Sequence, residues 1–219
     1  MKLLLTSAGI TNESIRKALE ELLDKPLEKS KVAFIPTAAH GAVGDKSWLA
    51  HEMQLANNLG WQEFNVVELT ALTTAQIKKQ LEAADVIYIN GGNAYFLMNR
   101  IVSSGLEKML PDLLKKKVYV SSSAGGIVAS KYFPGNLASV YGEEWKLEQG
   151  TIDHGLGLVD FVIKPHLNSP KFPERTIDWY EQMASRIEAP FYAIDDNTAI
   201  KVVDDQAEVI SEGKWKRYS

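Results

Sequence analysis

Three consecutive serines, residues 121–123, stand where an apolar segment gives way to small residues. Residues 118–120, Val-Tyr-Val, are typical of a short buried strand, and residues 124–130 are typical of the start of a helix. A serine at a sharp turn between a strand and a helix is held clear of the sheet, as in a nucleophile elbow. This position makes Ser123 a candidate nucleophile.

The neighbours of Ser123 match the elbow on one side. An elbow needs small residues two positions before and after the serine, because the backbones crowd together there. Gly125 meets this need, whereas Ser121 stands where the usual pattern has glycine. The following helix would offer free N–H groups and the positive end of its dipole to an anion. The alternative is a tight strand–helix turn whose serines are there only because they are small.

A serine nucleophile needs a base that accepts its proton, and the chain has four histidines. His166 follows an apolar run and Pro165, so we expect a fixed side chain at a strand end. His40 and His51 lie in and after an early loop, where solvated side chains are expected. His154 lies in an irregular stretch and has no evident partner. Position therefore favours His166 as the base, the alternative being a histidine that packs in a loop.

The groups that would orient the base and hold an oxyanion are less closely defined. Asp195 and Asp196 both follow an apolar run, and adjacent residues of an extended chain point in opposite directions. One of them would face the site, unless both are solvated loop carboxylates. The N–H of Ala124 is the obvious oxyanion donor. Gly91 or Gly92 would add a second, because glycine lets the backbone approach closely, unless this pair only forms a loop before a helix.

Strands and helices alternate through the first 130 residues. Strands are predicted at 3–6, 32–35, 64–69, 86–89 and 118–120, helices at 15–23, 47–59, 73–83, 94–102 and 106–115, and a loop at 38–45. This alternation predicts an α/β fold with a mainly parallel, doubly wound sheet and helices on both faces. Ligands bind beyond the carboxyl ends of such strands, where loops 6–10, 90–93 and 121–124 should meet.

The pattern changes after residue 130. Residues 133–160 are rich in glycine and aromatic residues and show no clear helix. A strand is predicted at 161–164, a helix at 175–187, and antiparallel strands from 193 to the end, with a turn at 204–205 and a last edge strand around 215–218. We therefore expect a small antiparallel C-terminal extension of the sheet, and a single domain over residues 1–219.

Composition excludes several classes of function. A net charge of −4 without a basic stripe argues against a nucleic-acid partner. The absence of cysteine rules out disulfides, thiolate zinc sites and a cysteine nucleophile. No run of 18 apolar residues is present, and the N-terminal apolar run is too short for a signal peptide. We expect a soluble, cytoplasmic protein with no membrane partner; the sequence does not indicate its oligomeric state.

Six short motifs occur in an order that resembles one known family. They are Phe-Ile-Pro-Thr-Ala at 34–38, Gly-Gly-Asn at 91–93, Ser-Ala-Gly at 123–125, Gly-Leu-Gly-Leu at 155–158, Pro-His at 165–166 and Ile-Asp-Asp-Asn-Thr-Ala at 194–199. Together they resemble the peptidase E (aspartyl dipeptidase) and cyanophycinase family of serine peptidases. The resemblance implies a fold like the class I glutamine amidotransferases, with serine in place of their cysteine.

The resemblance also implies roles for individual residues. It makes Ser123 the nucleophile and His166 the base. The third member in the family is a glutamate, at the position that aligns with Asp196, so aspartate here is one departure and Ser121 is a second. The family cleaves peptide bonds next to aspartate, which suggests an arginine after the base that binds the aspartyl carboxylate. Arg175 is the candidate.

The sequence thus predicts a metal-independent serine peptidase, without a cofactor, that hydrolyses small peptides, and the resemblance implies peptides with an N-terminal aspartate. In this interpretation the N–H groups of Gly92 and Ala124 hold the oxyanion, and Asn93 and Arg175 bind the substrate. Two alternatives remain at this stage. One is a degenerate homologue that binds a ligand without turnover, and the other is an esterase that uses the same serine and histidine.

Overall fold

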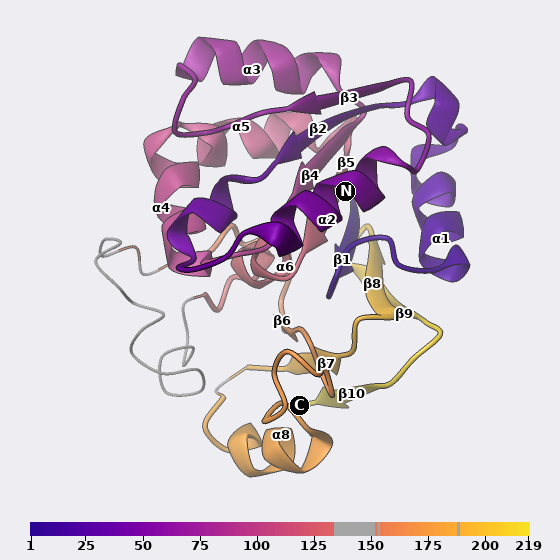
Figure 1. The fold of residues 1–219 in the computed structure, drawn as a ribbon, viewed down its shortest axis with the longest axis vertical. Helices are drawn as coiled ribbons and strands as arrows, with labels where there is room; N and C mark the ends of the chain where they lie inside the picture. The colour runs from indigo at the N-terminus through magenta and orange to yellow at the C-terminus, as the bar shows by residue number, and fades with distance from the viewer. Residues whose placement is uncertain (134–151, 153, 188) are drawn as a thin grey trace.

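The computed structural model describes residues 1–133, 152, 154–187 and 189–219 (Figure 1). The strands are β1 Lys2–Thr6, β2 Lys31–Ile35, β3 Glu63–Val66, β4 Val86–Ile89, β5 Val118–Ser122, β6 Val162–Lys164, β7 Phe191–Ile194, β8 Thr198–Val203, β9 Gln206–Ser211 and β10 Trp215–Tyr218. The helices are α1 Glu13–Leu23, α2 Ser47–Asn57, α3 Thr74–Ala83, α4 Ala94–Ser103, α5 Leu106–Leu113, α6 Ala124–Ala129 and α8 Ile177–Ala184, with short 3-10 helices η1 Leu27–Lys29 and η2 Thr37–Gly41.

The larger sheet has the strand order β3-β2-β4-β5-β1-β8-β9. Its first five strands are parallel, and β8 and β9 continue it in antiparallel fashion. β5 lies between β4 and β1, so the turn after β5 has the ends of two parallel neighbours beside it. The predicted fold class is confirmed: a mixed α/β fold with a mainly parallel central sheet and antiparallel C-terminal strands.

Both faces of the larger sheet are covered by helices. Along β1, Leu3 and Leu5 pack into one core with side chains from α3, α4, α5 and α6. Leu4 points to the other face, where it packs with side chains from α1 and α2. This alternation follows from the two-residue period of a strand and explains why β1 is apolar at every one of these positions.

Local signals set the helix boundaries. The capping box predicted before α3 is present: the Thr73 hydroxyl accepts the Gln76 N–H at 3.3 Å, and Gln76 Oε1 accepts the Thr73 N–H at 2.9 Å. α4 begins after Asn93, whose side-chain oxygen accepts the Phe96 N–H at 2.9 Å. The segment predicted as a loop at 38–45 is wrong in part, because η2 occupies Thr37–Gly41.

The C-terminal third forms a second sheet as well as extending the first. β6, β7 and β10 make a separate three-stranded sheet, in which β6 and β7 are parallel and β10 is an antiparallel edge strand. β8 and β9 join the larger sheet through a hairpin whose turn residues Asp204 and Asp205 both have positive φ, 45° and 69°. Figure 1 shows this smaller sheet and α8 below the larger sheet.

The helix predicted from residue 175 begins later. Thr176 is the N-cap of α8, and its hydroxyl accepts the Trp179 N–H at 3.2 Å, so Arg175 lies in the preceding loop. Tyr180 of α8 is fully buried and packs against Val162 and Phe191 of the smaller sheet.

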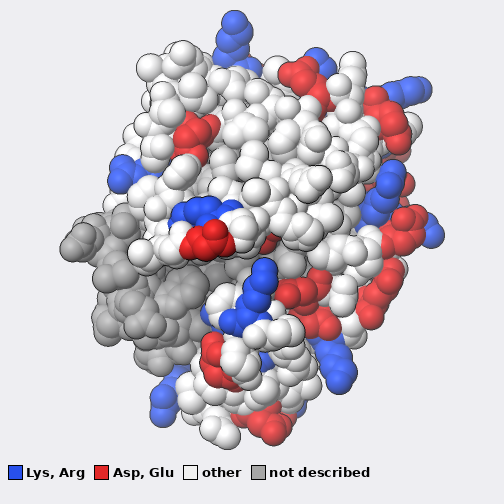
Figure 2. Space-filling model, in the orientation of Figure 1, with Lys and Arg blue, Asp and Glu red and all other residues white. Residues whose placement is uncertain are grey.

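The distribution of charged side chains on the surface agrees with the small net charge of the sequence. Figure 2 shows acidic and basic side chains interspersed on the face in view, and both signs border the hollow that crosses it. Among the described residues, no helix has the length and apolar character needed to cross a bilayer. Residues 134–151 and 153 of the glycine-rich stretch lie outside the described part; residues 154–160 contain no helix.

Candidate active site

Ser123 occupies a strained turn between β5 and α6. Its backbone has φ 46° and ψ −107°, a conformation that L-residues rarely adopt. The turn is fixed on both sides: the Ser123 N–H donates to the Thr6 carbonyl at 3.1 Å, and the Ser123 carbonyl accepts the Gly126 N–H at 2.9 Å. Such a turn holds the hydroxyl at the carboxyl end of the sheet, as the sequence predicted.

Two glycines of α6 make room for the unusual Ser121. A β-carbon on Gly125 would lie 2.3 Å from the Ile89 carbonyl oxygen and 3.1 Å from the Ser121 β-carbon. A β-carbon on Gly126 would lie 3.2 Å from the Ser121 hydroxyl. Because both positions lack side chains, a serine fits where the usual elbow has glycine.

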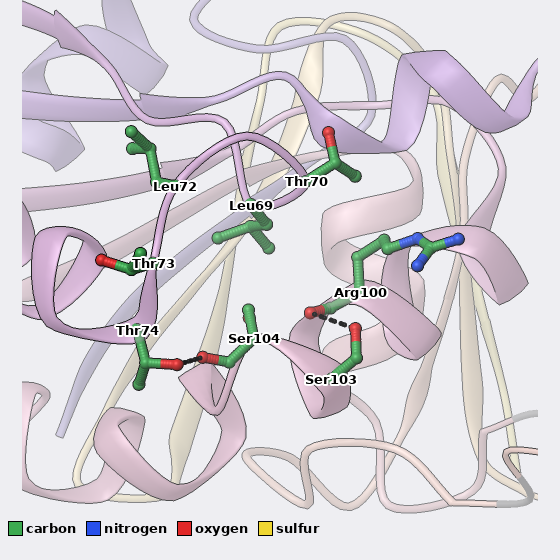
Figure 3. Close-up of a pocket in the computed structure, with 8 residues that line it drawn as sticks. All are labelled: Leu69, Thr70, Leu72, Thr73, Thr74, Arg100, Ser103 and Ser104. Carbon is green, nitrogen blue, oxygen red and sulfur yellow. Dashed lines mark hydrogen bonds between the residues drawn. The ribbon is translucent and has the colours of Figure 1, made fainter.

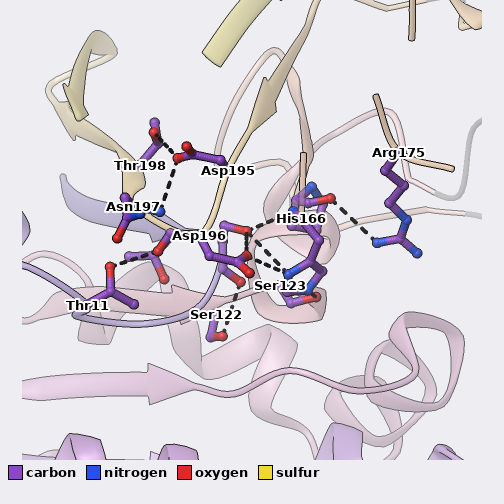
Figure 4. Close-up of polar contacts among 12 residues, drawn as sticks. Thr11, Ser122, Ser123, His166, Arg175, Asp195, Asp196, Asn197 and Thr198 are labelled. Carbon is purple, nitrogen blue, oxygen red and sulfur yellow. Dashed lines mark hydrogen bonds and ion pairs between the residues drawn. The ribbon is translucent and has the colours of Figure 1, made fainter. Parts of the chain in front are cut away.

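Ser123, His166 and an aspartate form a continuous chain of contacts (Figure 4). Ser123 Oγ lies 3.0 Å from His166 Nε2, and His166 Nδ1 lies 2.7 Å from Asp196 Oδ1. The three come from different places: the end of β5, the loop after β6, and the connection from β7 to β8. Both sheets therefore contribute to the cluster, and the β7–β8 connection runs between them.

Of the two adjacent aspartates, Asp196 faces the histidine. Asp195 instead folds its own turn: its carboxylate accepts the Asn197 N–H at 3.1 Å, the Thr198 hydroxyl at 2.7 Å and the Lys214 N–H at 2.5 Å. Figure 4 shows the two carboxylates directed to different partners, as expected for neighbours on an extended chain.

Ser7 links the histidine to the aspartate, a role that the sequence pattern did not indicate. The Ser7 hydroxyl donates to Asp196 Oδ1 at 2.7 Å and accepts the His166 backbone N–H at 2.8 Å. Its position could have indicated this, because it is a small polar residue directly after β1, and β1 lies between β5 and β8. The loop at 6–10 was expected to reach the site, but not this particular contact.

The pKa of Asp196 is lowered despite burial. Burial by itself would raise it, since a low-dielectric surrounding disfavours the charged form. The hydrogen bond and charge of His166 act against burial, and hydrogen bonds from Ser7 and Ser169 add to them. The net effect holds the pKa below its usual range, so the carboxylate is ionised at neutral pH and can accept a hydrogen bond from the imidazole.

The histidine ring is held by aromatic packing as well. Phe172 stacks on His166 with ring centroids 4.9 Å apart and planes 27° apart. The guanidinium of Arg175 lies 3.8 Å over the Phe172 ring, and the Arg175 side chain is only 4% exposed. Phe172 was not singled out from the sequence, since an aromatic residue in a loop gives no local signal of what it stacks on.

A cavity of about 840 Å³ opens over these groups. Ser123 and His166 lie in its wall, together with the loop that carries Gly92 and Asn93, and with Arg175. Five of the predicted site residues line this cavity, Ser123, His166, Gly92, Asn93 and Arg175, whereas Asp196 and Ala124 do not. The cavity is large enough for a small peptide.

The predicted oxyanion donors lie at this cavity or beside it. Ala124 opens α6, so its N–H has no partner within the helix. Gly92 has φ 139°, and a β-carbon there would lie 2.2 Å from the Ala38 carbonyl oxygen, so only glycine fits. A β-carbon on Gly91 would lie 3.2 Å from the Ser123 β-carbon, which places this loop directly against the serine.

Two of the remaining histidines lie away from this cavity, and the third, His51, lines it. His40 pairs with Glu68 at 3.1 Å and is mostly solvated, as expected. His154 lies 2.8 Å from Glu107 of α5, a contact that the sequence did not reveal. His51 is exposed on α2 at the outer wall of the cavity.

A second hollow, of about 560 Å³, lies between the start of α3 and the end of α4 (Figure 3). Its polar groups serve the fold: the Thr74 hydroxyl donates to the Ser104 carbonyl at 3.0 Å. Figure 3 shows the Arg100 guanidinium pointing away from Leu72 and Thr73. We therefore place the candidate active site at the larger cavity.

A serine on a strained turn, within hydrogen-bond distance of a histidine that a carboxylate orients, defines the class of serine hydrolases by geometry. The sequence matches the family model of peptidase family S51 over residues 3–210. It is 33% identical over 156 residues to an uncharacterized peptidase of Listeria innocua, which covers 68% of this chain and 70% of that protein. It is 25% identical over 191 residues to an uncharacterized peptidase of Pasteurella multocida, covering 84% and 86%.

Solved structures show the same fold. A crystal structure from Listeria monocytogenes EGD-e, described as a candidate peptidase E protein, superposes with a TM-score of 0.79 at 22% identity over 97% of this chain and 98% of that one. A peptidase from an acI-B1 actinobacterium gives 0.68 at 19% identity, over 98% and 88%. The chain belongs to peptidase family S51 and is a serine-type peptidase, a hydrolase whose substrates are peptides.

Proposed function

We propose that Ser123, His166 and Asp196 are the catalytic triad, and that the enzyme hydrolyses small peptides with an N-terminal aspartate. The observation that carries the proposal is the chain of contacts from Asp196 to His166 to Ser123, at 2.7 and 3.0 Å, with His166 and Ser123 in the wall of the large cavity. Triads are recognised by such geometry and by the roles of their members.

The reaction follows from this geometry. His166 Nε2 accepts the Ser123 proton as the hydroxyl oxygen attacks the peptide carbonyl, and Asp196 stabilises the resulting imidazolium. The N–H groups of Ala124 and Gly92 donate to the oxyanion of the tetrahedral intermediate. His166 then returns the proton to the leaving amine, and a water molecule hydrolyses the acyl-enzyme by the same path.

Arg175 is the proposed site for the aspartyl carboxylate. Its guanidinium lies at the cavity and packs on the Phe172 ring, which in turn stacks on the His166 ring. A planar guanidinium held in one orientation suits a carboxylate, which it can bind through two parallel hydrogen bonds. Asn93 is the second proposed substrate contact; its Oδ1 caps α4, which leaves its amide nitrogen to donate.

Hydrolysis of a dipeptide panel tests the proposal. The panel contains N-terminal Asp, N-terminal Ala and β-linked Asp-Arg members. Ser123→Ala should lower kcat by about 10⁶-fold, the scale of triad-serine removal. Ser103→Ala, at the end of α4, is the matched control and should be unaffected. Turnover that survives in Ser123→Ala would overturn the assignment.

Substitution of Arg175 tests the specificity. Arg175→Met keeps the packing of the aliphatic stem on Phe172 and removes the charge. We expect kcat/KM to fall by 10- to 100-fold or so for Asp-Ala, since a charged hydrogen bond is lost, and to change little for Ala-Ala. An equal loss on both peptides would show that Arg175 has no selective role.

A further inference from the structure

Glu52 of α2 lies in the wall of the same cavity as the triad, and nothing in the proposed reaction uses it. It is partly buried, whereas most of the acidic residues that the structure describes are exposed. A carboxylate held at an active-site cavity, away from bulk water, is unfavourable unless a partner is supplied.

No partner for one of its oxygens is present within the described part of the chain. Glu52 Oε2 is buried there without a hydrogen bond, and both polar atoms of the neighbouring Asn90 side chain are also buried without one. Asn90 lies close enough to lower the pKa of Glu52, but no hydrogen bond of normal geometry joins the two. An unsatisfied carboxylate oxygen therefore lies in the wall of the cavity that Ser123 also lines, and the unsatisfied Asn90 side chain is buried beside it.

The charged groups around Glu52 do not neutralise it. Lys171 is the nearby cation and acts on Glu52 through its charge, yet no ion pair within 4.0 Å joins them among the described residues. Asp196 acts in the opposite sense, and Tyr88 of β4 presents a buried neutral hydroxyl. Burial is the largest effect and raises the pKa of Glu52 to about 7.

We propose that Glu52 binds the free α-amino group of the substrate, so that the peptidase acts on the N-terminal residue of a peptide. An ammonium offers three donors and a positive charge, which match a carboxylate. In an N-terminal aspartate, the α-carbon next to the reacting carbonyl carries both the ammonium and the methylene that bears the carboxylate. Glu52 and Arg175 supply the complementary charges from two different elements of one cavity.

This inference rests on the proposed peptidase reaction and adds the residue that recognises the free amino group. It predicts that the enzyme releases an N-terminal residue and rejects peptides blocked at the amino group. An internal peptide bond has an amide in place of the ammonium, and it would leave the Glu52 carboxylate buried without a partner.

The test compares Asp-Ala with succinyl-Ala, which lacks only the amino group and adds no bulk. Glu52→Gln should lower kcat/KM for Asp-Ala by 10- to 100-fold or so, and leave succinyl-Ala within about twofold. Glu52→Asp should recover part of the loss. Glu82→Gln, an exposed residue of α3, is the matched control and should change neither substrate.

Binding supplies a readout that does not depend on turnover. In the Ser123→Ala background, calorimetry should show that Glu52→Gln weakens Asp-Ala by a similar factor and leaves succinyl-Ala unchanged. Equal weakening of both ligands, or none, would overturn the inference. If Ser123→Ala keeps turning over peptides, the proposed function fails instead, and the binding comparison still decides the role of Glu52.

The pH dependence gives a third readout. In the ratio of kcat/KM for Asp-Ala to that for succinyl-Ala, the ionisation of the triad cancels. The ratio should rise as pH passes about 7, where Glu52 ionises, and fall above about 8, where the α-amino group loses its proton. In Glu52→Gln the rise should disappear. A ratio that does not vary with pH in the wild type would contradict the inference.

Discussion

At the scale of single residues, the site depends on hydrogen bonds that fix the imidazole. Asp196 binds one ring nitrogen, and Ser7 binds both the Asp196 carboxylate and the His166 backbone. The nearby Asp195 is the same residue type, but it is used by its own turn. The adjacent aspartates therefore allow a matched test of position.

Asp196→Asn should lower kcat by about 10⁴-fold, because the amide favours the wrong imidazole tautomer. Asp195→Asn should lower the thermal midpoint by loosening its turn, with kcat nearly unchanged. Steady-state kinetics and thermal melts on both variants measure this. The opposite order of effects would place the orienting carboxylate at Asp195.

Ser7 gives a prediction for a positioning residue. Ser7→Ala removes one donor to Asp196 and one acceptor from the His166 N–H. We expect kcat to fall by about 10-fold, with KM little changed, since a bond to a charged group is lost from the catalytic unit and not from the substrate. Ser7→Thr, which keeps the hydroxyl, should restore part of the activity. A change in KM alone would argue against this role.

At the scale of elements, β5, the turn at Ser123 and α6 pack too closely for a side chain at Gly125. Gly125→Ala would place a β-carbon 2.3 Å from the Ile89 carbonyl oxygen. We expect a loss of about 1–3 kcal/mol in the free energy of unfolding, together with loss of activity. Chemical denaturation followed by far-UV circular dichroism measures the first.

Ser121→Ala is the control at the same place. The Ser121 hydroxyl is buried without a hydrogen-bond partner within the described residues, so its removal should leave the free energy of unfolding unchanged or raise it. If Gly125→Ala proved as stable as Ser121→Ala, the close packing described for the turn would be wrong.

The elements differ in how far the sequence alone predicted them. The strands of the parallel sheet and the capping box at Thr73 follow from local patterns, and they are confirmed, except that β3 ends at Val66 and not at residue 69. The separate sheet of β6, β7 and β10 is not encoded locally, because these strands are far apart in the chain and their pairing is a tertiary choice. Arg175 lies in a loop because Thr176 caps the start of α8, and the helical pattern of the sequence did not reveal this cap.

The candidate site likewise contains residues that the sequence predicted and residues that it did not predict. Ser123 was predicted from its place between a strand and a helix, and the structure brings it together with His166. The contact of Ser7 required the strand order, and the exposure of Glu52 to the cavity required the packing of α2. Neither is visible in a linear pattern.

At the scale of the whole molecule, the burial of Glu52 at the cavity lowers the stability of the folded state. Burial raises the Glu52 pKa to about 7 from its ordinary value of 4.5. Between these values the folded state binds more protons than the unfolded state, so this group makes the protein less stable as pH rises, and the penalty is complete above about pH 7.

Glu52→Gln removes this penalty. It should raise the free energy of unfolding by about 1–3 kcal/mol at pH 8, where the carboxylate is charged, and have little effect near pH 5. Thermal melts at the two pH values measure this, with Glu82→Gln as the exposed control. An equal shift at both pH values would mean that the charge of Glu52 is not responsible.

The most direct test of the central claim is covalent labelling by a serine-directed fluorophosphonate, followed by peptide mapping with mass spectrometry. We predict one modified residue, Ser123, with labelling lost in Ser123→Ala and strongly slowed in His166→Ala. Labelling of a different serine, or undiminished labelling of Ser123→Ala, would contradict the assignment of the nucleophile.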